Sequence, residues 1–278
     1  MDSVHYTTSA MTFGNHAAPN DPSRMYDDIK PALRPSDGGY CSTYNTATAH
    51  AGMMQGPQDA STRTTRPIVT GTSVLGLVYN GGVIVAADTL GSYGSLARFR
   101  SFQRIKKVND CCFIAASGDL SDYQHVSDLL DQMVLENRLE EDGQELQPRE
   151  VFNYLSRVLY NRRNKMDPLW NYIAVAGFQN NEPFLALVDL MGTCYEDKLV
   201  ATGYGAHIAM PLLRNAYRPD LTKEAAEKVM TDAMRVLVYR ECRTVNNIQF
   251  ATAEADGVNI GEPRKLNTDW SVGHRVAH

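Results

Sequence analysis

Residues 62–73 read TRTTRPIVTGTS, and five of these twelve residues are threonine. A threonine hydroxyl inside a chain is a weak nucleophile, because the neighbouring amide nitrogen cannot accept its proton. At the start of a chain, the free α-amino group has a pKa near ~8 and serves as the base. Cleavage of the Gly71–Thr72 bond would therefore make Thr72 an N-terminal nucleophile. Without that cleavage, the ordinary interpretation is that Thr72 caps or borders the strand that follows it.

The segments that must position this threonine begin directly after it. TSVLGLVY (72–79) and GGVIVAAD (81–88) are β-rich runs, and the Asn-Gly pair at 80–81 predicts a hairpin. The second run is apolar on both faces, so we expect a strand that is covered on both sides. A further strand pair, RIKKV (104–108) and CCFIAAS (111–117), follows along the chain.

Helices and strands then come in groups. Apolar residues at helical spacing predict two amphipathic helices in succession, and a second helical pair follows the glycines of TGYGA. Such runs of each type favour antiparallel sheets with helices outside them. The sequence therefore predicts an α+β protein, a four-layer αββα sandwich over about residues 72–261. We expect helices at 122–139, 148–163, 206–216 and after Thr222, strands at 171–179, 183–190 and 193–202, and a hairpin at 247–260 that turns at Asp256-Gly257.

The composition argues against several classes of partner. With 43% hydrophobic residues and a net charge of −5, the chain can bury a core but lacks the clustered Lys and Arg that nucleic acid or an anionic membrane attracts. The five cysteines have no zinc-ligand spacing, so we expect reduced thiols in an intracellular protein. The apolar runs are shorter than the about 20 residues of a membrane helix. We expect no cofactor, no metal, and neither nucleic acid nor membrane as a partner.

Residues 1–63 differ from the rest of the chain. They contain three branched aliphatic residues, Val4, Ile29 and Leu33, among many polar residues, glycines and prolines. Such a segment cannot bury enough apolar surface to offset the entropy of ordering it, so we expect a flexible extension. Two interpretations stay open at this point: a tail without a further role, or a propeptide that is removed.

The run GTSVLGLVYNGGVIVAAD (71–88) resembles the opening hairpin of proteasome β subunits, in which a Gly-Thr bond precedes the first strand. The resemblance continues over residues 64–261 through ASGDLSDYQ, ATGYGA and YREC in the expected order. It implies the N-terminal nucleophile hydrolase fold. Within the family, GSYGSLARFR, NKMDPLW and ATGYGA are most similar to a non-catalytic eukaryotic subtype that holds the seventh β position of the ring.

The resemblance also implies which residues would form a catalytic site. In active β subunits an N-terminal Thr attacks the peptide carbonyl, and an Asp sixteen residues later and a Lys thirty-two residues later hold it and tune its charge. Carried over without gaps, the Thr falls on Thr72 and the Asp on Asp88, but the lysine position is Arg104. A Ser, an Asp and a second Ser complete an active site, and their positions here are Tyr204, Glu241 and Thr244.

Three of these six positions are altered in ways that matter chemically. Arginine stays protonated, and its planar fork does not fill a lysine's place. Tyr204 would put a large ring where a small hydroxyl should bond the amine, and Glu241 is one methylene longer than aspartate. Lys106 or Lys107 could replace the missing lysine only by a strand shift, and a one-residue slip reverses the faces of a strand. We expect both lysines on a solvated or subunit-facing surface. Whether either of them replaces the missing catalytic lysine stays open at this point.

A second junction lies upstream of the Gly-Thr bond. The resemblance implies that this subtype loses its propeptide between a basic residue and a Thr, with a Pro three residues on, which here is Arg63-Thr64 with Pro67. We expect maturation to leave Thr64 as the N-terminus, with TTRPIVTG covering the region where an active site would open. A neighbouring subunit that prefers basic residues could make this cut.

Two functions follow from the resemblance. The first is a non-catalytic structural β subunit of the proteasome core particle, needed for ring assembly and for the chamber in which partner subunits degrade proteins. The alternative is an active threonine endopeptidase with Thr72 as its nucleophile. The expected partners are the other α and β subunits in stacked seven-membered rings, with assembly chaperones as a further class, in the cytoplasm and nucleus.

We expect residues 262–278 to form a tail that contacts neighbouring subunits through Trp270, or else a loose polar tail.

Overall fold

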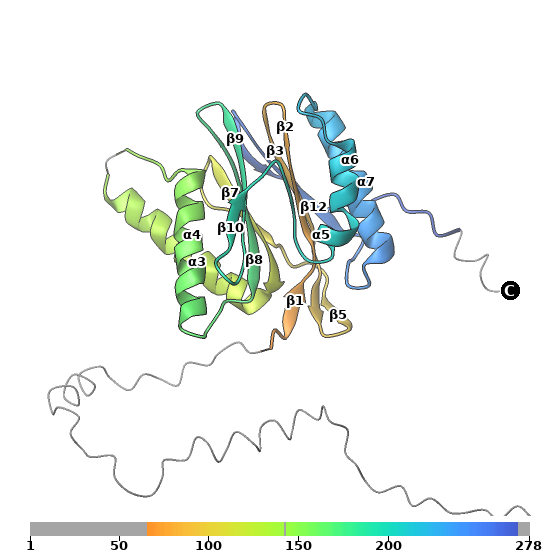
Figure 1. The fold of residues 1–278 in the computed structure, drawn as a ribbon, viewed down its shortest axis with the longest axis horizontal. Coiled ribbons are helices and arrows are strands. Elements are labelled where there is room, and N and C mark those ends of the chain that lie inside the picture. Colours follow the sequence, from red (N-terminus) through yellow and green to blue (C-terminus); the bar gives the residue numbers. More distant parts are fainter. Residues whose placement is uncertain (1–65, 142, 272–278) are drawn as a thin grey trace, which may run out of the picture. The chain divides into compact units, whose positions relative to one another are not determined.

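A computed structural model describes residues 66–141 and 143–271 (Figure 1). The predicted propeptide, 1–63, and the predicted junction at Arg63 and Thr64 lie outside the described residues. Where the structure describes the chain, it contains thirteen strands and five helices, so the predicted α+β class is confirmed. The strands form two sheets in which every pairing is antiparallel, as the grouping of strands and helices indicates.

One sheet contains the predicted opening hairpin. Its five strands pair in the order β11-β2-β3-β12-β13. The hairpin turn is made possible by Gly81, whose φ of 95° is a left-handed conformation that glycine adopts without strain. The central strand β3 is buried along its whole length, as its apolar sequence predicts. The strands are β2 Val74–Tyr79, β3 Gly82–Asp88, β11 Leu199–Ala201, β12 Ile248–Glu254 and β13 Gly257–Ile260.

The other sheet has eight strands. Their order is β10-β9-β8-β7-β1-β4-β5, and β6 pairs with β7 beside this path. The two predicted strands 171–179 and 183–190 form a hairpin within it, and positive φ angles at Asn180 and Asn181 make the turn. The strands are β1 Val69–Gly71, β4 Gly91–Tyr93, β5 Leu96–Phe99, β6 Ile105–Lys107, β7 Cys112–Asp119, β8 Asn171–Gln179, β9 Glu182–Val188 and β10 Cys194–Glu196.

The helices lie on the outer faces of the two sheets (Figure 1). Helices α3 and α4 cover the eight-stranded sheet, and α5, α6 and α7 cover the five-stranded sheet. The longest helices have side-chain caps: Asp119 accepts hydrogen bonds from two amides at the start of α3, and Thr222 accepts one at the start of α7. The helices are α3 Leu120–Leu139, α4 Pro148–Asn164, α5 Gly205–Ile208, α6 Met210–Ala216 and α7 Lys223–Arg240.

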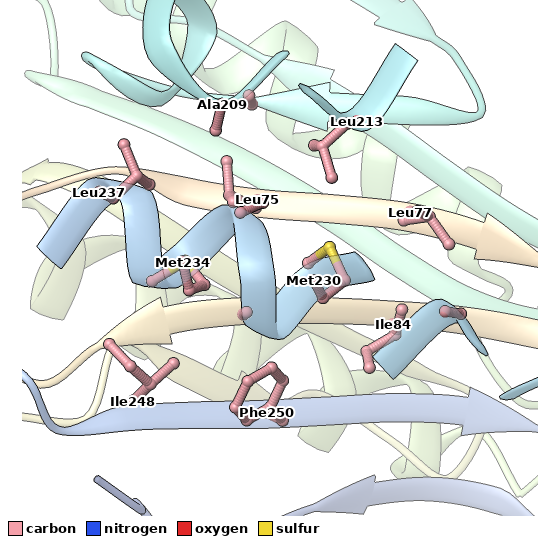
Figure 2. Close-up of a cluster of buried hydrophobic side chains, with 14 of the residues drawn as sticks. Leu75, Leu77, Ile84, Ala209, Leu213, Met230, Met234, Leu237, Ile248 and Phe250 are labelled. Carbon is pink, nitrogen blue, oxygen red and sulfur yellow. The ribbon is translucent and has the colours of Figure 1, made fainter. Parts of the chain in front are cut away.

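Three layers of buried side chains hold these elements together. Strand β2 shows the alternation clearly: Leu75 and Leu77 face the helices, whereas Val74 faces the other sheet. Figure 2 shows Met230 and Met234 of α7 packed over this face of the sheet. Each fully buried side chain of this size contributes about 1.5–3 kcal/mol relative to an exposed one. Between the sheets the side chains are mostly Val and Ala, which allow the two strand layers to approach.

Two predicted elements differ from the structure. Residues 193–202 form two strands in different sheets, because the chain crosses over at Asp197 and Lys198, whose backbones bond Leu185 of one sheet and Val78 of the other. The predicted helix 206–216 is two helices, α5 and α6, and Pro211 lies at the start of the second. The short strands β1, β4 and β5 were not predicted, because three or four residues carry too little periodicity to be recognised.

The last described residues run back along the subunit's own surface. Arg264 forms an isolated bridge with Ile248 of β12, and Leu266 is buried in the core beneath α7. The Asp269 amide donates to the Tyr239 hydroxyl at 2.6 Å, and the Trp270 ring packs edge-on against the same tyrosine with centroids 5.0 Å apart. The described start of the predicted tail is therefore anchored to α7 and β12.

Candidate functional site

Thr72 lies where the chain passes from the eight-stranded sheet to the five-stranded sheet. The residues before it form β1, in which Gly71 pairs with Gly91 of β4 and with Gly118 of β7. Thr72 itself is buried, and its Oγ1 donates a hydrogen bond of 2.7 Å to Oδ1 of Asp88, the last residue of β3. The gap-free alignment of the sequence thus places Thr72 beside the aspartate that the family pattern predicts.

Arg104 fills the space beside this pair and is fully buried. Its Nη1 donates to the carbonyl oxygens of Thr72 at 2.7 Å and Ala116 at 3.1 Å. Its Nε donates to the Asp88 carbonyl at 3.0 Å, and its Nη2 donates to the Ser73 carbonyl at 3.1 Å and forms an ion pair with the Asp88 carboxylate. The planar fork of one guanidinium therefore ties backbone groups of both sheets to a carboxylate.

The backbone approaches this arginine so closely that position 71 requires glycine. A Cβ atom on Gly71 would lie 2.5 Å from Cδ of Arg104. The Arg104 side chain cannot move aside easily, because its guanidinium is held by several hydrogen bonds. In this protein, the glycine of the Gly-Thr pair thus has a packing role that does not depend on cleavage.

A second hydroxyl, on Ser73, takes part in a separate buried contact that sequence reasoning missed. Its Oγ donates to Oε2 of Glu241 at 2.8 Å and accepts from the Gly205 amide at 2.8 Å. Burial raises the pKa of Glu241 above its usual range, although the hydrogen bond from Ser73 opposes the rise. The only signal in the sequence was the position of Ser73 directly after Thr72.

Tyr204 and Thr244 are near this second contact, but the Tyr204 side chain is exposed and Thr244 is partly buried. The Tyr204 side chain is 65% exposed at the start of α5, and it is the neighbouring Gly205 amide that points to Ser73. The structure therefore places the Tyr204 ring on the surface and not beside Thr72, because the loop turns its backbone inward. Thr244 is partly buried in the loop after α7, and its amide donates to the Glu241 carbonyl at 3.2 Å.

The two lysines after Arg104 have other partners. Lys106 Nζ donates to Asp131 at 2.6 Å, and Lys107 Nζ pairs with Asp110 at 2.6 Å. Strand β6 pairs with β7 so that Ile105 lies opposite Ala115. In this register neither lysine reaches the position of Arg104, and the strand shift needed for the substitution is not present.

These contacts limit the chemistry that Thr72, Asp88 and Arg104 can carry out. Where the chain runs on through Gly71, the Thr72 nitrogen is an amide and cannot act as a base. The guanidinium of Arg104 has only hydrogen-bond donors, so it cannot accept the hydroxyl proton. The Asp88 carboxylate is engaged on both oxygens, because Oδ2 also accepts from the Val245 amide at 3.0 Å. The arrangement is a buried hydrogen-bonded junction between two sheets.

Comparison with known proteins gives the family. The sequence profile described as "Proteasome subunit" matches residues 68–253, about two-thirds of the chain. The chain belongs to the family of proteasome β subunits. The resemblance noted in the sequence is thereby confirmed.

Several relatives of this β subunit are similar along most of their length. "Proteasome subunit beta type-4" of Xenopus laevis is 46% identical over 77% of this chain and 89% of the relative. The protein of the same name in Dictyostelium discoideum is 45% identical over 76% of this chain and 83% of its own. "Proteasome subunit beta type-7" of Saccharomyces cerevisiae is 46% identical over 78% of this chain and 84% of the relative. Each helix within 66–141 and 143–271 of this subunit is too short or too polar to span a lipid bilayer.

Proposed function

We propose that this chain is a non-catalytic structural β subunit of the proteasome core particle. Its layers, helices outside two facing sheets, support the αββα sandwich of the N-terminal nucleophile hydrolases as its fold. Its role is to complete a β ring and to support the chamber in which partner subunits cleave proteins. The proposed partners are the other α and β subunits in stacked seven-membered rings, in the cytoplasm and nucleus, with assembly chaperones as a further class.

The observation that carries this proposal is the buried position of Arg104. Its guanidinium occupies the place between Thr72, Asp88 and β7 with hydrogen bonds that a lysine ammonium cannot reproduce, since that group has no planar fork. Arginine supplies charge here but no capacity to exchange a proton. Support also comes from β1, whose ladder bonds hold the residues upstream of Thr72 in the sheet.

The proposal includes a cut at Arg63-Thr64 and not at Gly71-Thr72. The first described residues after that junction lead into β1, so a chain that starts at Thr64 keeps this strand, whereas a chain that starts at Thr72 loses it. Residues 1–63 are then a propeptide and residues 64–261 the β-type domain. We also propose that residues 262–278 contact neighbouring subunits. The packing of Trp270 on Tyr239 would fix the point from which this tail leaves the subunit.

The test is the N-terminal sequence and intact mass of this subunit in purified core particles. We expect a chain that begins at Thr64 and is not modified by a threonine-directed covalent inhibitor. The labelled catalytic subunits of the same particles are the positive control for the inhibitor. A subunit that begins at Thr72 and carries the inhibitor there would overturn the proposal.

The alternative function, a threonine endopeptidase, is favoured by one observation. Thr72 Oγ1 lies 2.7 Å from the Asp88 carboxylate, as an oriented nucleophile would. The same inhibitor experiment decides between the two functions, because only the endopeptidase exposes a free amine on Thr72.

A further inference from the structure

The last described residues are joined to the junction at Thr72 by one short stretch of loop. We call residues 261–271 the strap. We call residues 245–247 the relay, which lies between the end of α7 and the start of β12. The relay contacts the junction on one side and the strap on the other. Neighbouring residues make these two contacts, so a displacement at one of them can reach the other directly along the backbone.

On the junction side, the relay bonds the end of β3. The Val245 amide donates at 3.0 Å to Oδ2 of Asp88, whose Oδ1 accepts from the Thr72 hydroxyl. The carbonyl oxygen of Asn247 accepts from the Thr89 amide at 3.1 Å, and the Asn247 side-chain amide donates to the Thr89 hydroxyl at 2.8 Å. The relay therefore supplies the partner of the second oxygen of this buried carboxylate.

On the other side, the Asn246 side chain holds the strap. Its Oδ1 accepts from the Leu266 amide at 2.8 Å, and its Nδ2 donates to the Leu266 carbonyl at 2.9 Å. Leu266 is buried, whereas most of the strap is exposed. A segment that is largely exposed and held by hydrogen bonds near the surface opens locally before the protein unfolds as a whole. Attachment of the strap thus depends on the Asn246 side chain.

The relay has space to move on its outer side. An open cavity of about 460 Å³ lies beside it, lined by Val245 and Asn246, by Glu241 and Thr244 of the same loop, and by Trp270 of the strap. The relay residues are themselves only partly buried. Because packing does not fix the relay on this side, its position depends on its hydrogen bonds to the junction and to the strap.

The chemistry of the two contacts makes each of them sensitive to the other. The Val245 amide bonds a buried charge, and such a charge is destabilised more than a neutral group when it loses a donor. The Asn246 side chain makes two bonds to one residue of the strap, so its movement releases both. A single peptide bond joins Val245 to Asn246, and displacement of either residue moves the other.

We propose that the relay couples the strap to the junction. A seated strap holds the Val245 amide on Asp88, and an intact junction holds the strap in place. Coupling between two sites is reciprocal, so each stabilises the other by the same factor. Partner subunits that bind the tail beyond residue 271 then tighten the junction. This last step rests on the proposed function, whereas the coupling itself rests on contacts within one chain.

The test is amide hydrogen exchange of the full-length chain, measured on overlapping peptides that cover the relay and the strap. In Asp88→Asn the relay loses its charged acceptor, so the Asp269 amide of the strap should exchange about fivefold faster than in the wild type. In Trp270→Ala the strap loses its ring contact with Tyr239, and the Val245 amide should exchange faster by a similar factor.

A variant that interrupts the relay shows whether the effect passes through it. Asn246→Ala removes the side chain that holds the strap, so adding Asp88→Asn in this background should not accelerate exchange of the Asp269 amide further. Asn109→Ala is the matched control, because the Asn109 side chain also bonds two backbone groups, the Cys111 amide and the Leu146 carbonyl, outside the relay and the strap. It should leave the exchange of both reporter amides unchanged.

Three results in the isolated chain would overturn the coupling. The first is an Asp269 amide that does not respond to Asp88→Asn. The second is a response that persists in full after Asn246→Ala. The third is an equal acceleration of the amides of β8, which would mean that Asp88→Asn acts through global unfolding.

Purified core particles test the part that rests on the proposed function. The Val245 amide of the full-length chain should exchange at least about fivefold more slowly in particles than in the isolated chain. Equal rates would overturn the link between the tail and the junction. If the chain does not enter core particles at all, the proposed function fails, and the isolated chain still decides whether the strap and the junction are coupled.

Discussion

The junction around Thr72 and the two ends of the eight-stranded sheet use their side chains in opposite ways. At the junction, Thr72, Asp88 and Arg104 are buried and bonded to one another. At the sheet ends, Leu96 and Tyr195 point their apolar groups to the surface. Polar groups that are fully paired inside the protein stabilise it but are not accessible to substrate. Apolar groups left outside add little to folding, yet they are available to a partner. This difference supports the proposed role, in which the subunit assembles and does not catalyse.

The largest effect is expected at the centre of the junction. Arg104→Ala leaves the Asp88 carboxylate buried without its cation, so the free energy of unfolding should fall by about 3–5 kcal/mol. Urea unfolding of the full chain measures this. Arg98→Ala, on the exposed strand β5, is the control and should change it by less than about 0.5 kcal/mol. Equal effects of the two substitutions would contradict a structural role for the buried ion pair.

A methyl group at position 71 should have the next largest effect. Gly71→Ala places a Cβ against the Arg104 side chain, which cannot relax, so we expect a loss of about 1–3 kcal/mol from overpacking. Gly261→Ala is the control, because its added Cβ would meet a single backbone oxygen at 3.3 Å. Thermal or urea unfolding measures both variants. If Gly71→Ala lowers the free energy of unfolding by less than Gly261→Ala does, the backbone can move away from Arg104.

The pH dependence of stability tests the second buried contact. Since the folded-state pKa of Glu241 is raised, the folded protein binds this proton at higher pH than the unfolded chain does. The wild type should therefore gain stability relative to Glu241→Gln as the pH falls through the raised pKa, and the gain should be complete below the unfolded-state value. Unfolding of both proteins at a series of pH values measures it. A difference that does not vary with pH would contradict the burial of an ionisable Glu241.

The smallest effect on folding is expected at the sheet ends. Leu96→Asp and Tyr195→Asp should each change the free energy of unfolding by less than about 0.5 kcal/mol in the isolated chain, since both side chains are partly or largely exposed. The same variants should be poorly incorporated into core particles. A loss of several kcal/mol in the isolated chain would instead give these residues a role in folding and would remove the contrast with the junction.

Local patterns predicted much of the fold. The hairpin over 72–88 follows from two β-rich runs and the Asn-Gly turn between them, which act between neighbours in the chain. The short strand β1 was missed, since its three residues are held by pairing with β4 and β7 and not by their own propensity. The separation of β10 from β11 was missed for a similar reason: the crossover between sheets depends on backbone bonds to distant strands.

The candidate site shows the same contrast between what local sequence patterns predict and what distant contacts decide. From the sequence, the resemblance to proteasome β subunits implied that Thr72, Asp88 and Arg104 meet, and the register of the predicted hairpin accounts for the approach of the first two. Only the tertiary structure decided that Ser73, and not Thr72, bonds Glu241 across 168 residues, and that the Tyr204 ring turns outward. The physical reason is that short-range patterns specify strands and turns, whereas the direction of a side chain at a junction depends on which distant backbone groups need a partner.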